Sequence, residues 1–268
     1  MIIFHHNDAD GRCAAAIALR EYPDASCVEL DYKDRVPVEL IDGGCIIVDF
    51  SFKPPDMEEA FKRGTVIWID HHASAKAYAY LATVGGLRDF RDKGFSGCEL
   101  AWKYFNPGES IPYFVTLLGD YDSWRLKEKD SLAFYEGLKL EDQNPVSGIW
   151  ASLFDDPGHL ELRAIISQGK AAIRYRDRYC AEMRKAFGYE TEFDGYRAYA
   201  LNVQRFGSLA FDSDHPLYIA YVHDGTKYTV SLYSTTIDVS VIATKYGGGG
   251  HRGAAGFVCK ELPWQVQQ

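Results

Sequence analysis

Short apolar segments alternate with helix-like segments along about the first 100 residues of the chain. CIIVDF (45–50) and TVIWID (65–70) are nearly continuous runs of apolar and β-branched residues, the pattern of strands that are buried on both faces. The segment between them, PDMEEAFKRG (55–64), has helix-forming residues and a glycine at its end. Strands and helices that alternate at this spacing predict βαβ units with a parallel sheet, so we expect an α/β protein.

The remaining patterns divide the chain into three parts. Residues 1–130 are predicted to hold the parallel sheet, residues 131–188 show no strand pattern and predict a helical connector, and residues 189–268 predict a smaller α+β domain. The strands are expected at 1–4, 26–32, 45–50, 65–70, 196–203, 215–223, 227–234 and 254–259, and the helices at 11–22, 55–64, 96–105, 158–188 and 238–246.

Composition limits the partners of the chain. Its 268 residues are 47% hydrophobic and 25% charged, as in an ordinary globular protein, and its formal net charge is −9. A surface of that charge repels nucleic acid, so cations must be gathered locally for an anionic substrate, and long duplex nucleic acid is not an expected partner. No apolar run reaches the roughly 18 residues that span a bilayer, and the first residues lack the features of a signal peptide. We therefore expect a protein that does not bind a membrane. Because the six cysteines are scattered, we also expect reduced thiols and a cytoplasmic location.

Carboxylates and imidazoles follow the predicted strands directly. In a parallel sheet the carboxyl ends of the strands open on one edge, where ligands bind. The strand at 1–4 runs into HHNDADG, the strand at 45–50 contains an aspartate near its end, and the strand at 65–70 runs into a histidine pair; LLGDYDSW follows a further apolar run. The donors that converge in this way are His6, Asp8, Asp10, Asp49, Asp70, His71, His72, Asp120 and Asp122.

Each of these motifs has an ordinary explanation when it is taken alone. Adjacent histidines are common on surfaces, Asp49 is typical of a helix cap or a turn, and Asp120 with Asp122 is typical of a solvated loop. Their convergence on one sheet edge favours a site for two divalent ions that share a carboxylate. Oxygen and nitrogen donors suit Mn²⁺ better than Ca²⁺, and the absence of thiolates argues against structural zinc.

Five motifs in order resemble those of one superfamily. HNDADG, VDF, IDHH and LLGDYD are similar to the four motifs of the DHH phosphoesterase superfamily, and YGGGGHRGAAGF (246–257) is similar to the signature of its companion C-terminal domain, DHHA1. The resemblance spans nearly the whole chain and constrains residues 130–190 least. DYDSW (120–124) resembles the fourth motif of the nano-RNase and nucleotide phosphodiesterase branch. The resemblance implies a DHH catalytic domain at 1–130 and a DHHA1 substrate-binding domain at 189–268.

The resemblance also implies a ligand set for two Mn²⁺ ions, with Mg²⁺ or Co²⁺ as alternatives. Residue His72 is then catalytic and steadies the phosphoryl oxygens, and Asp49 is the carboxylate that bridges the ions. We select His6 and not His5 because His6, Asp8 and Asp10 share one face of an extended segment, and His5 stays the alternative. The implied ligands are His6, Asp8 and Asp49 for one ion and Asp10, Asp49, His71 and Asp120 for the other.

The glycine-rich segment is implied to bind the phosphate or the terminal nucleotide of a substrate. Glycines let backbone N–H groups approach phosphate oxygens, and the histidine and arginine that follow add charge-assisted bonds. A flexible hinge with an incidental histidine is the ordinary alternative. Relatives often carry an arginine where SLYS (231–234) has Tyr233, and either that tyrosine or Arg205 is expected to take its place. The predicted substrate-binding residues are Gly248, Gly249, Gly250, His251, Arg252 and Arg205.

The function implied by the resemblance is that of a metal-dependent phosphoesterase. Two ions about 3.5–4 Å apart would support attack by water, without a protein nucleophile. The expected substrates are short nucleotides: oligoribonucleotides, dinucleotides such as pApA, or 3′-phosphoadenosine phosphate (pAp). An inorganic pyrophosphatase or short-chain exopolyphosphatase is the alternative, and a non-catalytic nucleotide-binding module is the third reading. The sequence leaves the oligomeric state open, a homodimer included.

Overall fold

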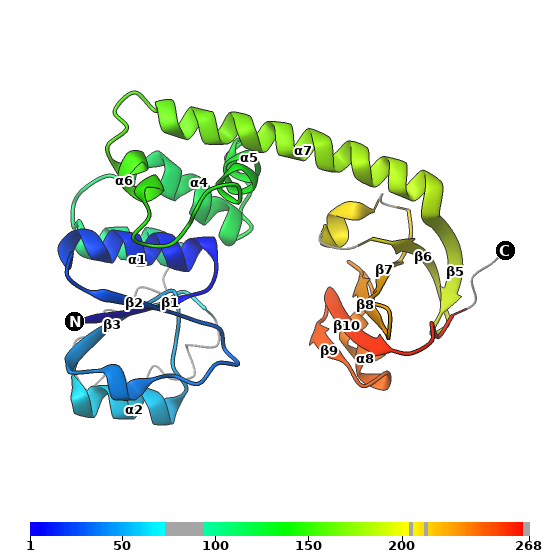
Figure 1. Cartoon of the computed structure of the whole chain (residues 1–268), viewed down its shortest axis with the longest axis horizontal. Helices are drawn as coiled ribbons and strands as arrows, with labels where there is room; N and C mark the ends of the chain where they lie inside the picture. The colour runs from blue at the N-terminus through cyan, green and yellow to red at the C-terminus, as the bar shows by residue number, and fades with distance from the viewer. Residues whose placement is uncertain (73–93, 204–205, 212–213, 265–268) are drawn as a thin grey trace. The chain divides into compact units, whose positions relative to one another are not determined.

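The structure is a computed structural model that describes residues 1–72, 94–203, 206–211 and 214–264 (Figure 1). The chain divides into two compact units, Met1–Ala172 and Ile173–Gln268, which we describe separately. The three-part division by function expected from the sequence stays a prediction.

A four-stranded parallel sheet organises the first unit. Its strand order is β2-β1-β3-β4: strand β2 lies on one side of β1, and β3 followed by β4 lies on the other side. The boundary between β1 and β3 is therefore a topological switch point, the place where open α/β sheets bind ligands beyond the carboxyl ends of their strands. The strands are β1 (Ile2–His6), β2 (Ser26–Leu30), β3 (Gly43–Val48) and β4 (Gly64–Ile69).

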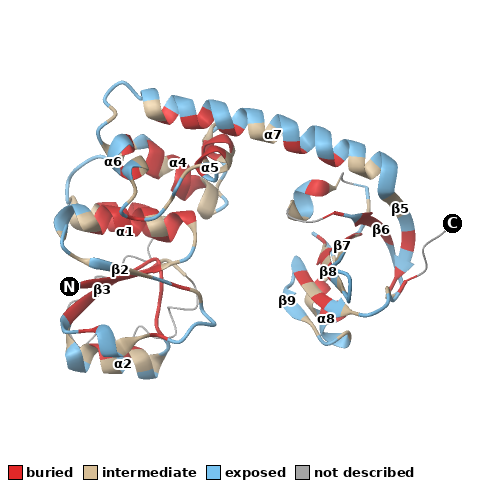
Figure 2. Cartoon of the chain, viewed as in Figure 1, coloured by how far each residue is buried: buried red, intermediate tan, exposed pale blue. Residues whose placement is uncertain are grey.

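Helices cover both faces of this sheet, which explains why its strands are continuous apolar runs (Figures 1 and 2). Alternate residues of one strand serve opposite faces, so Phe4 and Ile47 pack with Met57 of α2 on one side while Ile3 faces the other helices. The helices of this unit are α1 (Ala9–Glu21), α2 (Pro54–Arg63), α3 (Gly97–Phe105), α4 (Tyr113–Asp122), α5 (Ser131–Leu138) and α6 (Gly148–Phe154), with a 3₁₀ turn, η1 (Val38–Leu40). The 28-residue helix α7 (Leu160–Phe187) spans the boundary of the two units.

Side-chain caps fix the starts of the two helices nearest the switch point. Asp8 is the N-cap of α1 and accepts a hydrogen bond from the backbone N–H of Gly11 at 2.9 Å. Ser96 begins α3 with a capping box, in which its hydroxyl accepts from the backbone of Glu99 and the Glu99 carboxylate accepts from the backbone of Ser96. These caps place polar side chains and helix N-termini at the sheet edge.

The second unit holds a six-stranded sheet of order β5-β6-β7-β8-β10-β9. Only β6 and β7 pair in parallel among these neighbours; the other pairs are antiparallel. Helix α8 (Val239–Lys245) packs on one face over a core that includes Ile219, Leu232 and Phe257. The strands are β5 (Gly188–Phe193), β6 (Tyr196–Asn202), β7 (Leu217–His223), β8 (Tyr228–Tyr233), β9 (Gly249–His251) and β10 (Ala254–Cys259), with a 3₁₀ turn, η3 (Gly207–Ala210).

The predicted fold class is confirmed: a parallel sheet in the N-terminal part and a second, mixed sheet in the C-terminal part. Among the elements that were not predicted individually, three differ most from the expectation. Strand β5 follows α7 without a break, strand β9 lies within the glycine run, and LLGDYD belongs to helix α4 and not to a loop. The last difference changes the composition of the site described next.

Candidate metal centre

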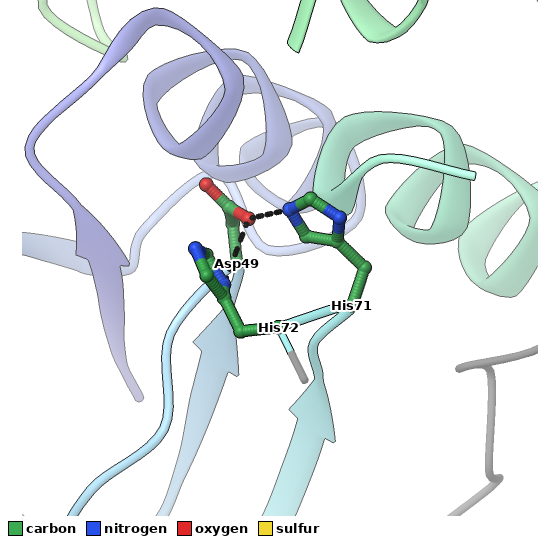
Figure 3. A group of neighbouring side chains, drawn as sticks. All are labelled: Asp49, His71 and His72. Carbon is green, nitrogen blue, oxygen red and sulfur yellow. Dashed lines mark ion pairs between the residues drawn. The ribbon is translucent and has the colours of Figure 1, made fainter. Parts of the chain in front are cut away.

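Donor side chains from three strand ends meet at the switch point of the first unit. His6 ends β1, Asp49 follows β3, and His71 and His72 follow β4. Figure 3 shows the Asp49 carboxylate between the two imidazoles. The structure brings His6 to this cluster, whereas the buried His5 ring contacts the backbone carbonyl of His6 through Nδ1 at 2.8 Å.

Asp49 is the centre of the cluster. Its Oδ1 lies 3.1 Å from His71 Nε2 and 3.8 Å from His72 Nδ1, whereas its Oδ2 lies 3.9 Å from His6 Nδ1. The carboxylate is fully buried, and within the described part of the chain neither oxygen accepts a hydrogen bond. Buried carboxylates are normally satisfied, so two orphaned oxygens that face different imidazoles fit a carboxylate that bridges two cations.

The backbone at Asp49 is shaped for this position. Its φ is +53°, a left-handed conformation that an aspartate adopts at a modest cost. Gly97, the first residue of α3, packs against it so closely that a Cβ there would lie 2.4 Å from Asp49 Cβ and 2.5 Å from Oδ1. Only glycine therefore allows the start of α3 to close over the carboxylate.

Three groups of donors satisfy the distances of a cation site, with the ligand atoms of each group within 4.8 Å of one another. Asp49 belongs to two of the groups and His71 also belongs to two, as expected for neighbouring cation positions. They are His6, Asp8 and Asp49; Asp49, His71 and His72; and Asp10, His71 and Asp122.

The N-terminus of α3 orients the Asp10 carboxylate through hydrogen bonds. The Ser96 hydroxyl and the backbone N–H of Cys98 donate to its Oδ1 at 2.8 and 3.1 Å, and the backbone N–H of Gly97 donates to its Oδ2 at 2.6 Å. A helix N-terminus stabilises a carboxylate at this position. His71 Nε2 lies 3.8 Å from Oδ2, so the same oxygen faces the cluster.

The ligand expected from the fourth motif needs a correction: the structure brings Asp122, and not Asp120, to the cluster. Asp122 Oδ2 lies 3.4 Å from His71 Nε2. Asp120 instead accepts hydrogen bonds from the Ser131 hydroxyl at 2.6 Å and from the backbone N–H groups of Lys127 and Glu128 at 3.1 and 3.0 Å. The physical reason is that the segment is helical. Residues two apart on a helix face nearly opposite sides, so one of the two aspartates must point away from the site.

Asp120 contributes to the site indirectly, through Arg125 and Glu99. Arg125 lies 3.6 Å from its Oδ1 through Nε and donates from Nη2 to both oxygens of the buried Glu99 at 2.9 Å. Glu99 caps α3, whose first turn holds Asp10. Asp120 therefore orders the segment between α4 and α5 and the start of α3.

Asp70 orients His72. Its Oδ1 accepts from the backbone N–H of His72 at 3.0 Å and contacts His72 Nδ1 at 2.8 Å, while its Oδ2 accepts from the hydroxyl of Ser51. A carboxylate that holds one ring nitrogen of a histidine fixes the ring and leaves the other nitrogen for a ligand or a substrate. The motif IDHH indicated Asp70 as a donor but gave no sign of this role.

Charge repulsion shapes the electrostatics of the cluster. Burial, together with the Asp10 and Asp8 carboxylates, raises the pKa of Asp49 well above its usual range. The same causes raise the pKa of Asp122 to about 8. Burial opposes the charge of His72, but the hydrogen bond to Asp70 and the negative charges of Asp70, Asp122 and Asp8 together outweigh burial and raise the pKa of the imidazole. A cation bound among these carboxylates would supply the positive charge that offsets their repulsion.

Tyr32 is a neighbour of the site that the sequence did not indicate. It follows β2, its ring stacks on Phe50 at a centroid distance of 4.8 Å, and it contacts the His6 and His72 rings at 5.4 and 5.7 Å. Burial and the nearby Asp70 carboxylate raise the pKa of this phenol well above its usual value. The position of Tyr32 at the end of the strand predicted at 26–32 was the available signal, because all strand ends of a parallel sheet share this edge.

The glycine run of the second unit forms a hairpin and not an irregular loop. Gly249–His251 is the edge strand β9, paired with β10, and Gly250 has φ +144°. A Cβ at Gly250 would lie 2.5 Å from Ala255 Cα, so close pairing of the two strands is one reason for glycine here. The backbone N–H of Gly248 is bonded to the carbonyl of Ala243, whereas the side chains of His251 and Arg252 are exposed.

The register of this sheet sets Tyr233 and His251 in one row. Ala254 of β10 lies opposite His251 on one side and opposite Tyr233 of β8 on the other. Directly opposed residues share a face of the sheet, so the small Ala254 separates an imidazole from a phenol on that face. Arg205, the other expected replacement for the family arginine, lies outside the described residues.

Among the described residues, no helix has both the length and the apolar character that a membrane span requires.

The fold and its strand-end donors define an α/β protein with a candidate centre for divalent cations. Residues 1–118 match the DHH family, N-terminal domain, in agreement with the resemblance of the sequence motifs. Oligoribonuclease NrnB of Bacillus subtilis (strain 168) is 28% identical over 166 residues, which are 57% of this chain and 41% of that protein. The chain spans about half the length of the curated relatives it matches.

The solved structures that share this fold include a phosphodiesterase and an exonuclease. The pGpG-specific phosphodiesterase PggH from Vibrio cholerae has a TM-score of 0.60 and 12% identity, and the match covers 97% of this chain and 93% of that one. The exonuclease RecJ bound to manganese has a TM-score of 0.51 and 14% identity, and the match covers 96% of this chain and 85% of that one.

Proposed function

We propose that this chain is a two-cation phosphoesterase that hydrolyses short nucleotide phosphodiesters or phosphomonoesters. The observation that carries the proposal is the buried Asp49 carboxylate, whose two unpartnered oxygens face different groups of donors. Such an arrangement is typical of metal-assisted hydrolysis of phosphate esters.

The donor groups suggest which residues hold each cation. One position would use His6, Asp8 and Asp49, and the other would use Asp10, Asp49, His71 and Asp122. Mixed carboxylate and imidazole donors suit Mn²⁺, and RecJ, which shares this fold, has been solved with manganese. Bound there, the cations would polarise a phosphoryl oxygen and lower the pKa of water.

The residues of the chain would orient the substrate around this centre. Asp70 holds Nδ1 of His72 and so fixes the direction of Nε2. We propose that Nε2 donates a hydrogen bond to a phosphoryl oxygen, since the contact with Asp70 favours the protonated ring. In the second unit, the exposed His251 and Arg252, together with Gly248, Gly249 and Gly250, are proposed to bind a phosphate or the terminal nucleotide of the substrate.

Short nucleotides are favoured over long RNA for two reasons. The net charge of −9 supplies no extended basic track for many phosphates. NrnB is named as an oligoribonuclease and PggH as a pGpG-specific phosphodiesterase, so a relative and a protein of the same fold act on short chains.

The test is a hydrolysis screen in Mn²⁺ over pApA, pAp, cyclic di-AMP, pyrophosphate and a 24-mer RNA. We expect kcat/KM on a dinucleotide to exceed that on the 24-mer by about 10-fold or more, because few basic side chains are available to neutralise phosphates that lie away from the metal centre. Equal rates on the two lengths would instead support a processive nuclease. Preferential turnover of pyrophosphate would support a pyrophosphatase, and no turnover with intact nucleotide binding would support a non-catalytic module.

His251→Ala tests the role proposed for the glycine segment. Loss of one charge-assisted bond should lower kcat/KM on pApA by about 10–100-fold while Mn²⁺ affinity stays unchanged. On the small ester bis-p-nitrophenyl phosphate, which has no distal nucleotide, kcat/KM of the variant should fall much less. Equal losses on both substrates would mean that His251 acts on the reacting phosphate and is not a distal contact.

A further inference from the structure

We propose that Tyr32 donates a hydrogen bond from its hydroxyl to an oxygen of the reacting phosphoryl group. This inference rests on the proposed phosphoesterase function and adds a substrate contact to the first unit. The ends of β1, β3 and β4 supply most of the candidate cation ligands, and the loop after the remaining strand, β2, supplies Tyr32.

The ring of Tyr32 is held in a fixed place by a turn and by aromatic packing. Its backbone lies in a turn in which Asp34 N–H donates to the Asp31 carbonyl at 2.9 Å and Asp31 N–H donates to the Asp34 carboxylate at 2.8 Å. The ring stacks on Phe50, which packs in turn against the fully buried Phe52. An anchored ring loses little conformational freedom on binding a ligand, so its polar end is pre-organised.

The ring also reaches the side of the cluster that a substrate must approach. It contacts the His6 and His72 rings, with centroid distances of 5.4 and 5.7 Å, yet Tyr32 remains 39% exposed. These two histidines belong to the donor groups on opposite sides of Asp49. The phenol is therefore adjacent to the place where the phosphoryl group is proposed to bind.

The hydroxyl of Tyr32 is an unused donor. Within the described part of the chain it makes no hydrogen bond, although a phenol has one O–H to donate. The neighbouring polar groups have other partners: the Asp70 carboxylate binds Ser51 and His72, and Asp8 contacts His6 at 2.7 Å and caps α1. A phosphoryl oxygen offers the acceptor that this environment leaves open.

The decisive variant is Tyr32→Phe, which keeps the ring and removes only the donor. On pApA and on bis-p-nitrophenyl phosphate, kcat should fall about 10-fold while KM changes little, because a bond that strengthens as charge develops acts mainly in the transition state. Mn²⁺ affinity and Tm should match those of the unaltered protein. Tyr113→Phe is the matched control, since Tyr113 is 40% exposed in the same unit and bonds Glu128 at 3.2 Å.

A second measurement separates this inference from the proposed function. Calorimetric titration of the Mn²⁺-loaded protein with inorganic phosphate should show binding about 10-fold weaker in Tyr32→Phe than in the unaltered protein, because the oxygens of the phosphate dianion carry more negative charge than those of an uncleaved diester and accept a stronger hydrogen bond. Weaker phosphate binding in the variant of a protein that hydrolyses no ester would support the Tyr32 contact and overturn the phosphoesterase. An active protein whose Tyr32→Phe variant matches it in kcat and in phosphate binding would overturn the Tyr32 contact alone. Loss of Mn²⁺ affinity or of Tm in Tyr32→Phe would also overturn it, since the tyrosine would then be structural.

Discussion

Replacing Asp49 by alanine or asparagine should abolish measurable hydrolysis, with kcat/KM lowered by about 1000-fold or more, and should remove Mn²⁺ binding at both proposed positions. The physical reason is that one carboxylate faces both groups of donors, through Oδ1 on one side and Oδ2 on the other. Isothermal titration with Mn²⁺ and a steady-state assay on pApA measure the two effects. A variant that still bound two ions would contradict the bridging role.

Asp49→Asn should at the same time stabilise the metal-free protein. Burial and neighbouring carboxylates raise the pKa of Asp49 in the folded state above its unfolded value. A group of this kind contributes stability below its unfolded pKa, near pH 4, and loses that contribution as pH rises through its folded pKa. In chelator at pH 8 the asparagine avoids this cost, so we expect Tm to rise by about 5 °C. Added Mn²⁺ should raise the Tm of the unaltered protein and leave that of Asp49→Asn unchanged.

Asp122→Asn should impair catalysis and Mn²⁺ binding, whereas Asp120→Asn should impair stability, although only one residue separates the two positions. Asp122→Asn should lower kcat/KM by about 100-fold and weaken Mn²⁺ binding, because its carboxylate joins the group of Asp10 and His71. Its folding should be intact or improved, since burial and the Asp10 and Asp8 carboxylates raise its pKa to about 8 in the metal-free protein.

Asp120→Asn should mainly destabilise the first unit. Its carboxylate accepts three hydrogen bonds and lies 3.6 Å from Arg125, so its loss should cost about 2–4 kcal/mol and lower Tm by about 5–15 °C. Below its melting temperature the variant should still bind Mn²⁺. If Asp120→Asn lost Mn²⁺ binding at unchanged Tm while Asp122→Asn kept it, the ligand set inferred from the sequence would be right and the one inferred from the structure wrong.

The contrast between these two aspartates shows which site residues can be predicted from the sequence and which cannot. Strand-end positions follow from strand recognition alone, since every parallel strand delivers its next residues to one edge; Asp49 and His71 could therefore be placed from the sequence. The residues of LLGDYD could not, because the choice between a loop and helix α4 decides which aspartate turns inward. An apolar run of this length fits either element until tertiary packing is known.

Other parts of the site depend on contacts between segments far apart in the chain. Ser96 and Gly97 bind Asp10 across 86 and 87 positions, and Tyr32 meets Phe50 only in the folded sheet. The sequence predicted α3 and its approximate start, but nothing in a helix cap indicates which carboxylate it will serve. The glycine run was recognised as unusual, whereas its pairing as β9 depends on the position of β10.

The orphaned carboxylate of Asp49 also links the lifetime of this protein to the metal supply around it. Under the proposed two-cation site, each tenfold rise in free cation above the dissociation constant adds about 1.4 kcal/mol of stability per position. Without cations the mutually repelling carboxylates favour opened forms, and opened forms are what proteases cut. A cell short of metal would therefore lose the protein itself as well as its turnover, so that abundance and catalytic rate would respond together to one nutrient.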